Sequence, residues 1–179
     1  LKKMGLPVLH TRATQLDDVA RLLRLFGQTT GHHAQGEAAA RDFTARLAAL
    51  HVPKLKQPPL SVFYQVWDRP LMTVGGTHWI SDALERCGAR NVFADLHGLS
   101  PVVSREAVLQ RAPEVIVSGS DAPDMRAQWQ RFSGLPAVKN QAFVRIDADR
   151  LHRLTPRLVE GVAALCNALK PALLQSGQR

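Results

Sequence analysis

The sequence predicts an α/β fold with a central, mostly parallel sheet. Short segments rich in β-branched and aromatic residues alternate with segments whose apolar residues recur at helical spacing. One such segment, residues 61–67 (SVFYQVW), has apolar residues on both faces, as a strand inside a parallel sheet requires. Loops with Pro and Gly separate these segments. This alternation is typical of a Rossmann-like lobe built from βαβ units.

The first 57 residues predict one βα unit and then a long helix. Residues 6–10 resemble a short strand, and residues 14–17 (TQLD) resemble a capping box ahead of a helix that ends at Gly27. A second helix is expected over residues 36–51, before a series of prolines. We interpret residues 33–57 as a backbone helix that connects two lobes. Residues 1–32 would then be the end of a truncated amino-terminal α/β lobe, because they are too few to fold alone.

Residues 58–179 predict a carboxyl-terminal α/β lobe. Its expected strands are residues 61–67, 91–93, 114–118 and 143–147. Its expected helices are residues 79–87, 104–113 and 123–132, and a last one for which Thr155 and Pro156 form the cap and the first turn. The chain starts without Met or a signal pattern, so we expect a processed chain or a fragment.

Composition and charge exclude several classes of protein. With 45% hydrophobic and 21% charged residues, the chain resembles ordinary globular proteins, and it has no apolar run long enough to cross a bilayer. The net charge is +8, but the basic residues are scattered and match no nucleic-acid-binding motif. We therefore expect no nucleic acid partner and interpret the charge as a solvated face.

The loop after residues 61–67 is the main candidate for a ligand site. Trp67, Leu71, Met72 and Trp79 lie on it or at its end, and in open α/β sheets ligands bind beyond the carboxyl ends of the strands. The alternative is that these residues belong to the core.

A second candidate is the charged segment over residues 147–153. Arg150 and Arg153 could donate paired hydrogen bonds to amide, carboxylate or phosphate oxygens, and Asp149 could accept hydrogen bonds. An exposed loop with ordinary charges explains the same residues. The sequence leaves both interpretations open.

Catalytic and metal-binding motifs are missing from the sequence. No nucleotide-binding, metalloprotease or hydrolase pattern occurs, and no two of the seven histidines have the spacing of metal ligands on one helix face. We expect no catalytic residue and no metal site. A remote alternative is a cytosolic α/β enzyme that uses Gly75 and Gly76 to bind a phosphate.

The two cysteines, Cys87 and Cys166, lie at the end of one predicted helix and inside the last one. They form no C-x-x-C pair, so zinc or redox chemistry is not indicated. In a reducing compartment they would be two buried thiols, and in an oxidising compartment they could form one bridge. Both possibilities remain open at the level of composition and spacing.

Four segments together resemble one known family. The segments are YQVWDRPLMTVGGTHWISDALERCGARNVF, PVVSREAVLQRAPEVIV, DADRLHRLTPR and ALCNAL. They resemble the carboxyl-terminal lobe of bacterial periplasmic vitamin B12 (cobalamin) binding proteins. That family of helical-backbone binding proteins also carries ferric siderophores and haem to ABC importers. The resemblance implies a non-enzymatic protein that captures a corrinoid in a cleft between two lobes, with a ferric siderophore or haem as the alternative ligand.

The resemblance also assigns individual residues. Ser100 and Arg150 stand where relatives have aromatic residues, which leaves the identity of the metal chelate open. The expected ligand-binding residues are Trp67, Met72, Trp79, Ser100, Asp149, Arg150, His152 and Arg153.

Other implied features concern partners and location. Glu106 matches a glutamate that docks onto arginines of the importer's permease, which is the expected membrane partner. Cys87 and Cys166 match a disulfide of relatives, which implies a periplasmic location. No cofactor beyond the bound ligand is implied, and we expect the full-length protein to be a monomer.

Overall fold

The fold is α/β and is built on a four-stranded parallel sheet. The computed structural model describes residues 2–50, 58–119 and 125–176. In the sheet the strand order is β2-β1-β3-β4. The strands are β1 (Leu60–Gln65), β2 (Ala89–Asn91), β3 (Val115–Gly119) and β4 (Phe143–Ile146). The predicted fold class and the parallel sheet are confirmed, and all four strands overlap their predicted ranges.

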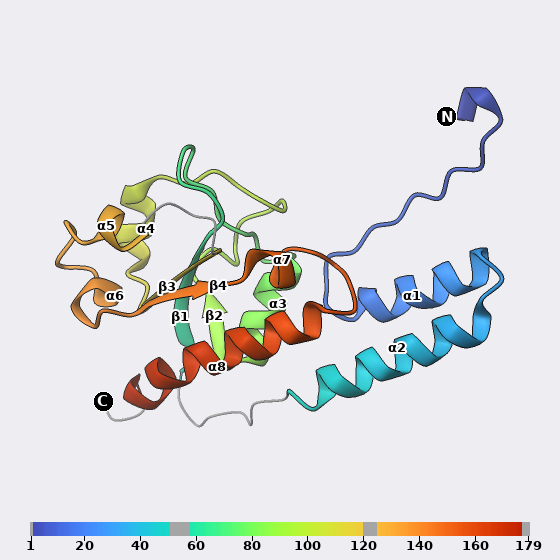
Figure 1. Cartoon of the computed structure of the whole chain (residues 1–179). Helices are drawn as coiled ribbons and strands as arrows, with labels where there is room; N and C mark the ends of the chain where they lie inside the picture. The colour runs from blue at the N-terminus through green and yellow to red at the C-terminus, as the bar shows by residue number, and fades with distance from the viewer. Residues whose placement is uncertain (1, 51–57, 120–124, 177–179) are drawn as a thin grey trace.

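Helices cover both faces of this sheet (Figure 1). Val62 and Tyr64 of β1 pack on one side, whereas Phe63 packs on the other. The ring centroids of Phe63 and Trp129 lie 5.7 Å apart. This alternation follows from the two-residue period of a strand. The first side is covered by α3 (Trp79–Arg86) and α8 (Leu158–Ser176). The second side is covered by α4 (Arg105–Arg111), α5 (Met125–Trp129) and α6 (Pro136–Lys139).

Two helices precede the sheet and form a hairpin beside α8 (Figure 1). They are α1 (Asp18–Thr29) and α2 (His33–Ala48). Gly27 and Gly36 lie where the helices cross, and a Cβ added to Gly36 would come 2.9 Å from Gly27 Cα. Only glycines permit so close an approach. Arg46 of α2 forms an ion pair with Glu160 of α8, with 3.6 Å between nitrogen and oxygen.

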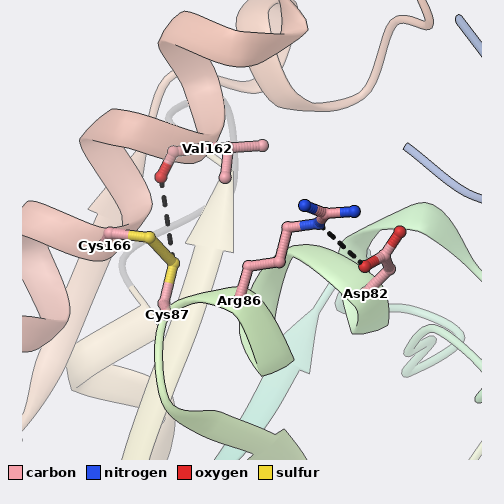
Figure 2. Close-up of a disulfide and its surroundings, with 5 residues drawn as sticks. All are labelled: Asp82, Arg86, Cys87, Val162 and Cys166. Carbon is pink, nitrogen blue, oxygen red and sulfur yellow. Dashed lines mark hydrogen bonds and ion pairs between the residues drawn. A yellow bond between two sulfur atoms is a disulfide. The ribbon is translucent and has the colours of Figure 1, made fainter. Parts of the chain in front are cut away.

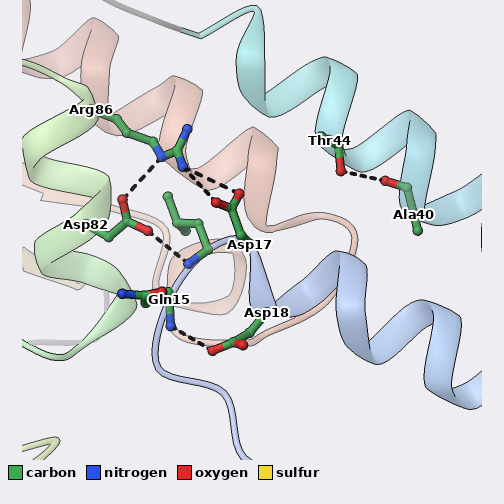
Figure 3. Close-up of polar contacts among 8 residues, drawn as sticks. Gln15, Asp17, Asp18, Ala40, Thr44, Asp82 and Arg86 are labelled. Atoms are coloured by element: carbon green, nitrogen blue, oxygen red, sulfur yellow. Dashed lines mark hydrogen bonds and ion pairs between the residues drawn. The ribbon is translucent and has the colours of Figure 1, made fainter.

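Polar contacts join α3 to the segment before α1 (Figure 3). Asp82 accepts a hydrogen bond from the backbone N–H of Leu16 at 3.0 Å, and Arg86 contacts both Asp82 and Asp17. Thr14 and Gln15 donate their backbone N–H groups to Asp18, at 2.8 and 3.1 Å. The carboxylate that closes this turn is therefore Asp18, and the predicted capping box with Asp17 was wrong by one residue.

The amino-terminal strand expected over residues 6–10 was wrong. A strand needs a hydrogen-bonded neighbour, and no described residue pairs with this segment in a sheet. A short 3₁₀ helix over Lys2–Met4 precedes it and lies apart from the body of the molecule, and the chain runs from there to the start of α1 (Figure 1). The predicted connecting helix corresponds to α2, while residues 51–57 of that prediction lie outside the described part of the chain.

Two helix predictions need correction near the carboxyl terminus. The last helix begins at Leu158, because Thr155 and Pro156 form a turn before it. Residues 147–153 were expected to be a loop but contain α7 (Ala148–Leu151). The side chain of Asp147 caps this helix by accepting a hydrogen bond from the Asp149 N–H. Helix α6 was also not expected.

The disulfide between Cys87 and Cys166 is present (Figure 2). Cys87 follows the last residue of α3, Cys166 lies within α8, and both are buried. The carbonyl oxygen of Val162 lies 3.9 Å from the Cys87 sulfur. The bridge implied by the family resemblance is confirmed, and it fastens α3 to α8. Within the described ranges, no helix is both long and apolar enough to cross a membrane.

Candidate ligand-binding site

A hollow of about 200 Å³ lies at the carboxyl edge of the sheet. Its walls come from the segment after β1, the start of α3, the loop before α4 and the end of α7. Three of the predicted ligand-binding residues, Trp79, Ser100 and His152, meet there. The complete lining is Val66, Val74, His78, Trp79, Ile80, Ser100 and His152. This hollow lies where open α/β sheets bind ligands.

Trp79 is a fixed wall of the hollow. Its indole Nε1 donates a hydrogen bond to the carbonyl oxygen of Leu151 at 2.9 Å, and this bond joins the start of α3 to α7. The ring of His78 stacks on the indole, with 3.8 Å between the ring centroids. A tryptophan held from two sides presents a preformed surface to a ligand.

His152 is held by a buried tyrosine under the hollow. Tyr64 Oη lies 2.8 Å from His152 Nε2, and the two rings meet edge to face. Burial raises the pKa of Tyr64, so the phenol keeps its proton. The hydrogen bond fixes the orientation of the His152 ring at the edge of the sheet.

His78 was not predicted as a site residue, yet it lines the hollow. It caps the amino terminus of α3, where its Nδ1 accepts a hydrogen bond from the Ile80 N–H at 3.1 Å. Burial, assisted by the neighbouring His152, lowers the pKa of His78 to about 4. The only signal in the sequence is a His directly before a helix, which is a weak one.

An exposed apolar surface adjoins the hollow. After β1 the chain forms a tight hairpin in which Met72 pairs with Trp67 on one side and with Val102 on the other. Trp67 is 56% exposed, Leu99 50% and Val102 62%. We call Trp67, Met72, Leu99 and Val102 the apolar rim. It adjoins the hollow along the chain, since Trp67 and Leu99 directly neighbour Val66 and Ser100, which line the hollow.

Leu99 and Val102 of this rim were missed at the sequence level. Single apolar residues in a loop are common on protein surfaces and give no signal by themselves. Only the pairing of Met72 with Val102 brings the two segments together.

The predicted charged residues lie on α7 and beyond it, outside the lining of the hollow. Arg153 pairs with Asp149 at 2.8 Å, and both are exposed. Arg150 pairs with Asp147 at 3.1 Å and approaches Glu160 of α8 at 3.8 Å. Ion pairs within the segment thus account for these charges, and the predicted contacts of Asp149, Arg150 and Arg153 with a ligand stay predictions.

Gly75 and Gly76 do not form a phosphate cradle. A Cβ added to Gly75 would lie 2.6 Å from the Leu96 carbonyl oxygen, and one added to Gly76 would clash with that of Ala94. The Gly76 N–H already donates to Leu96 O at 3.2 Å. Carbonyl oxygens at this position repel an anion, so the phosphate-binding alternative was wrong; the glycines permit close packing of two loops.

Glu106 lies in the first turn of α4 and is exposed. Ser104 caps this helix by accepting a hydrogen bond from the Ala107 N–H at 3.1 Å. A hydrogen bond from its own backbone N–H, together with one from Ser104, lowers the pKa of Glu106. The carboxylate is therefore ionised at neutral pH and accessible to a basic partner.

The pKa of His78 predicts an acid-sensitive fold. In the unfolded chain the ring binds a proton as the pH falls through about 6.5, whereas in the folded chain it stays neutral until about pH 4. The unfolded state binds more protons in this window, so stability present at pH 7 is lost as the pH falls. The free energy of unfolding should decrease by about 2 kcal/mol between pH 7 and pH 5 through His78 alone. Urea denaturation should show this decrease, and His78→Asn should remove that part of it.

A parallel sheet whose carboxyl edge carries an aromatic hollow and an apolar rim is typical of α/β proteins that bind small molecules. The comparison with protein families is more specific, since residues 1–150 match the family model described as periplasmic binding protein. The chain therefore belongs to the periplasmic binding protein family. This is the family that the sequence resemblance predicted.

Individual relatives extend the comparison. The chain is 32% identical to the vitamin B12-binding protein of Vibrio parahaemolyticus, over 93% of this chain and 61% of that relative. It matches the crystal structure of the periplasmic vitamin B12 binding protein BtuF of Vibrio cholerae with a TM-score of 0.83 and 31% identity, over 96% of this chain and 68% of that one. A possible iron-binding protein of Staphylococcus epidermidis also matches with a TM-score of 0.83, at 25% identity, over 94% of this chain and 68% of that one. The chain thus spans about 61% of the length of the first of these relatives.

Proposed function

We propose that the protein containing this chain captures a corrinoid of the vitamin B12 type in the periplasm and delivers it to an ABC importer. The observation that carries this proposal is the 32% identity to a vitamin B12-binding protein over 93% of the chain. The apolar rim and the hollow supply a suitable surface, because a flat macrocycle with polar edges needs apolar contact area and a few directed polar groups.

The architecture of the proposed protein follows the same relatives. Residues 1–32 would be the end of an amino-terminal lobe, residues 33–57 the connecting helix and residues 58–179 the carboxyl-terminal lobe. The rim and the hollow would then form one wall of a cleft between the lobes. Three contacts would keep this wall in place relative to α1 and α2: Leu16 to Asp82, Arg86 to Asp17, and Arg46 to Glu160.

Glu106 would dock the loaded protein onto the permease. An ionised, exposed carboxylate at the start of a helix is well placed to pair with arginines of a membrane partner. Charges at the edge of a protein–protein interface mainly set the rate and specificity of association. No chemistry on the ligand is required for this function.

Calorimetry on the full protein that contains residues 1–179 tests the proposal. Cyanocobalamin should bind with a Kd below one micromolar, and haem and a ferric hydroxamate should bind at least about 100-fold more weakly, which corresponds to about 2.7 kcal/mol. Failure of cyanocobalamin to bind at micromolar concentrations would overturn the proposal. Tight binding of haem or of the ferric hydroxamate alone would instead support a ferric siderophore or haem as the ligand. The similarity to a possible iron-binding protein is the reason for testing this alternative.

A further inference from the structure

We propose that His78 is a specificity-determining residue of this site and donates a hydrogen bond from Nε2 to the carbonyl oxygen of a ligand amide. The inference rests on the proposed function, since it names the part of the ligand that the hollow recognises. His78 lines the hollow together with Trp79, Ser100 and His152. A hollow of about 200 Å³ accommodates only a peripheral group of a large macrocycle, and the ring itself would lie on the apolar rim.

The position of the hydrogen on the His78 ring follows from its role as a helix cap. Nδ1 accepts a hydrogen bond from the Ile80 N–H, so Nδ1 carries no hydrogen. A neutral imidazole then carries its hydrogen on Nε2, and this atom is a donor. The cap thus fixes the tautomer, just as a second hydrogen bond commonly does for functional histidines.

The Nε2 donor is available to a ligand. No described residue accepts a hydrogen bond from it. In the described part of the chain, the side-chain atoms that are both fully buried and without a hydrogen-bond partner are Asp68 Oδ1 and Ser118 Oγ. Nε2 of His78 has no partner and is not one of them, so it is not fully buried and a ligand can reach it. The stacked indole of Trp79 holds the ring in place, with 3.8 Å between the centroids. A donor that is fixed before binding loses little freedom when the ligand arrives.

The charges around the hollow favour a neutral acceptor over a carboxylate. His78 is neutral, and the lining has no Lys, Arg, Asp or Glu. His78 also lines a second, polar hollow together with Asp17, Asp82, Glu85 and Arg86, where Arg86 pairs with Asp82 and Asp17. A carboxylate placed in the first hollow would lose hydration without a Lys or Arg of the lining to pair with, whereas an amide carbonyl needs only the N–H donor. Corrinoids carry amides around the ring and haem carries carboxylates, so this feature selects the corrinoid.

Two variants separate recognition from capping. In His78→Asn the side-chain oxygen can replace Nδ1 as the cap, but the donor at the position of Nε2 is lost. In His78→Gln the amide nitrogen reaches the position of Nε2, but the cap is lost. Binding of cyanocobalamin to the full protein is measured by calorimetry at pH 7, and thermal unfolding is recorded beside it. The exposed His33→Gln serves as the control.

The expected result is a crossover between the two variants. His78→Asn should raise the Kd about fivefold or more, and His78→Gln should bind nearly as wild type but melt earlier than His78→Asn, because only Asn keeps the cap. Equal affinity of wild type and His78→Asn would overturn the inference, and so would weaker binding by His78→Gln than by His78→Asn. If the wild type itself does not bind cyanocobalamin, the proposed function fails, which is a different outcome.

Discussion

Replacing both cysteines, as Cys87→Ala with Cys166→Ala, should lower the free energy of unfolding by about 4 kcal/mol. The bridge joins residues 79 positions apart, and closing so long a loop removes much of the entropy of the unfolded chain. Both residues are buried between α3 and α8, so the replacements expose no new polar group. Urea denaturation of the oxidised wild type and of the double variant measures the difference.

Two controls accompany this experiment. Wild type treated with a reductant should unfold at about the same urea concentration as the double variant, because both lack the bridge. Asn167→Ala, an exposed neighbour on α8, should unfold like the oxidised wild type. Equal midpoints for the double variant and the oxidised wild type would show that the bridge does not stabilise the fold.

The fold class could be predicted because the local pattern and the tertiary structure agree. Residues 61–67 have apolar residues on both faces, and most of them form β1, one of the two inner strands, while Ser104 caps α4 as expected. Residues 6–10 have a strand-like pattern but no neighbour to pair with, and pattern alone does not supply one. Asp18 replaced Asp17 in the turn before α1, because the partner of a side chain depends on the path of the backbone.

The candidate site was only partly predictable for a related reason. Trp67 and Trp79 stand out in the sequence as aromatic residues in a loop after a strand, and both lie at the carboxyl edge. His78 and Tyr64 gave no such signal. Tyr64 looks like any strand residue until its hydroxyl meets His152, which lies 88 positions away. Contacts of this range depend on the topology of the sheet, which residue spacing does not encode.

Trp67→Ala should weaken the binding of cyanocobalamin at least about tenfold and leave the stability of the fold nearly unchanged. Trp67 is 56% exposed where the hairpin begins, so its indole is not part of the core, and its Nε1 donates a hydrogen bond to the Arg69 carbonyl oxygen nearby. A large, rigid ring that is already exposed contributes contact area to a macrocycle at little entropic cost.

Trp67→Phe and Leu174→Ala complete this experiment. Trp67→Phe keeps part of the ring surface and should restore much of the affinity that Trp67→Ala loses. Leu174 is 72% exposed but lies at the end of α8, far along the chain from the rim, so its truncation should leave the Kd unchanged. If Trp67→Ala binds cyanocobalamin as tightly as the wild type does, the apolar rim is not the contact surface and the macrocycle must rest on another part of the cleft. A loss that Leu174→Ala shares would point instead to a general effect of removing exposed apolar area, because the two variants have only that change in common.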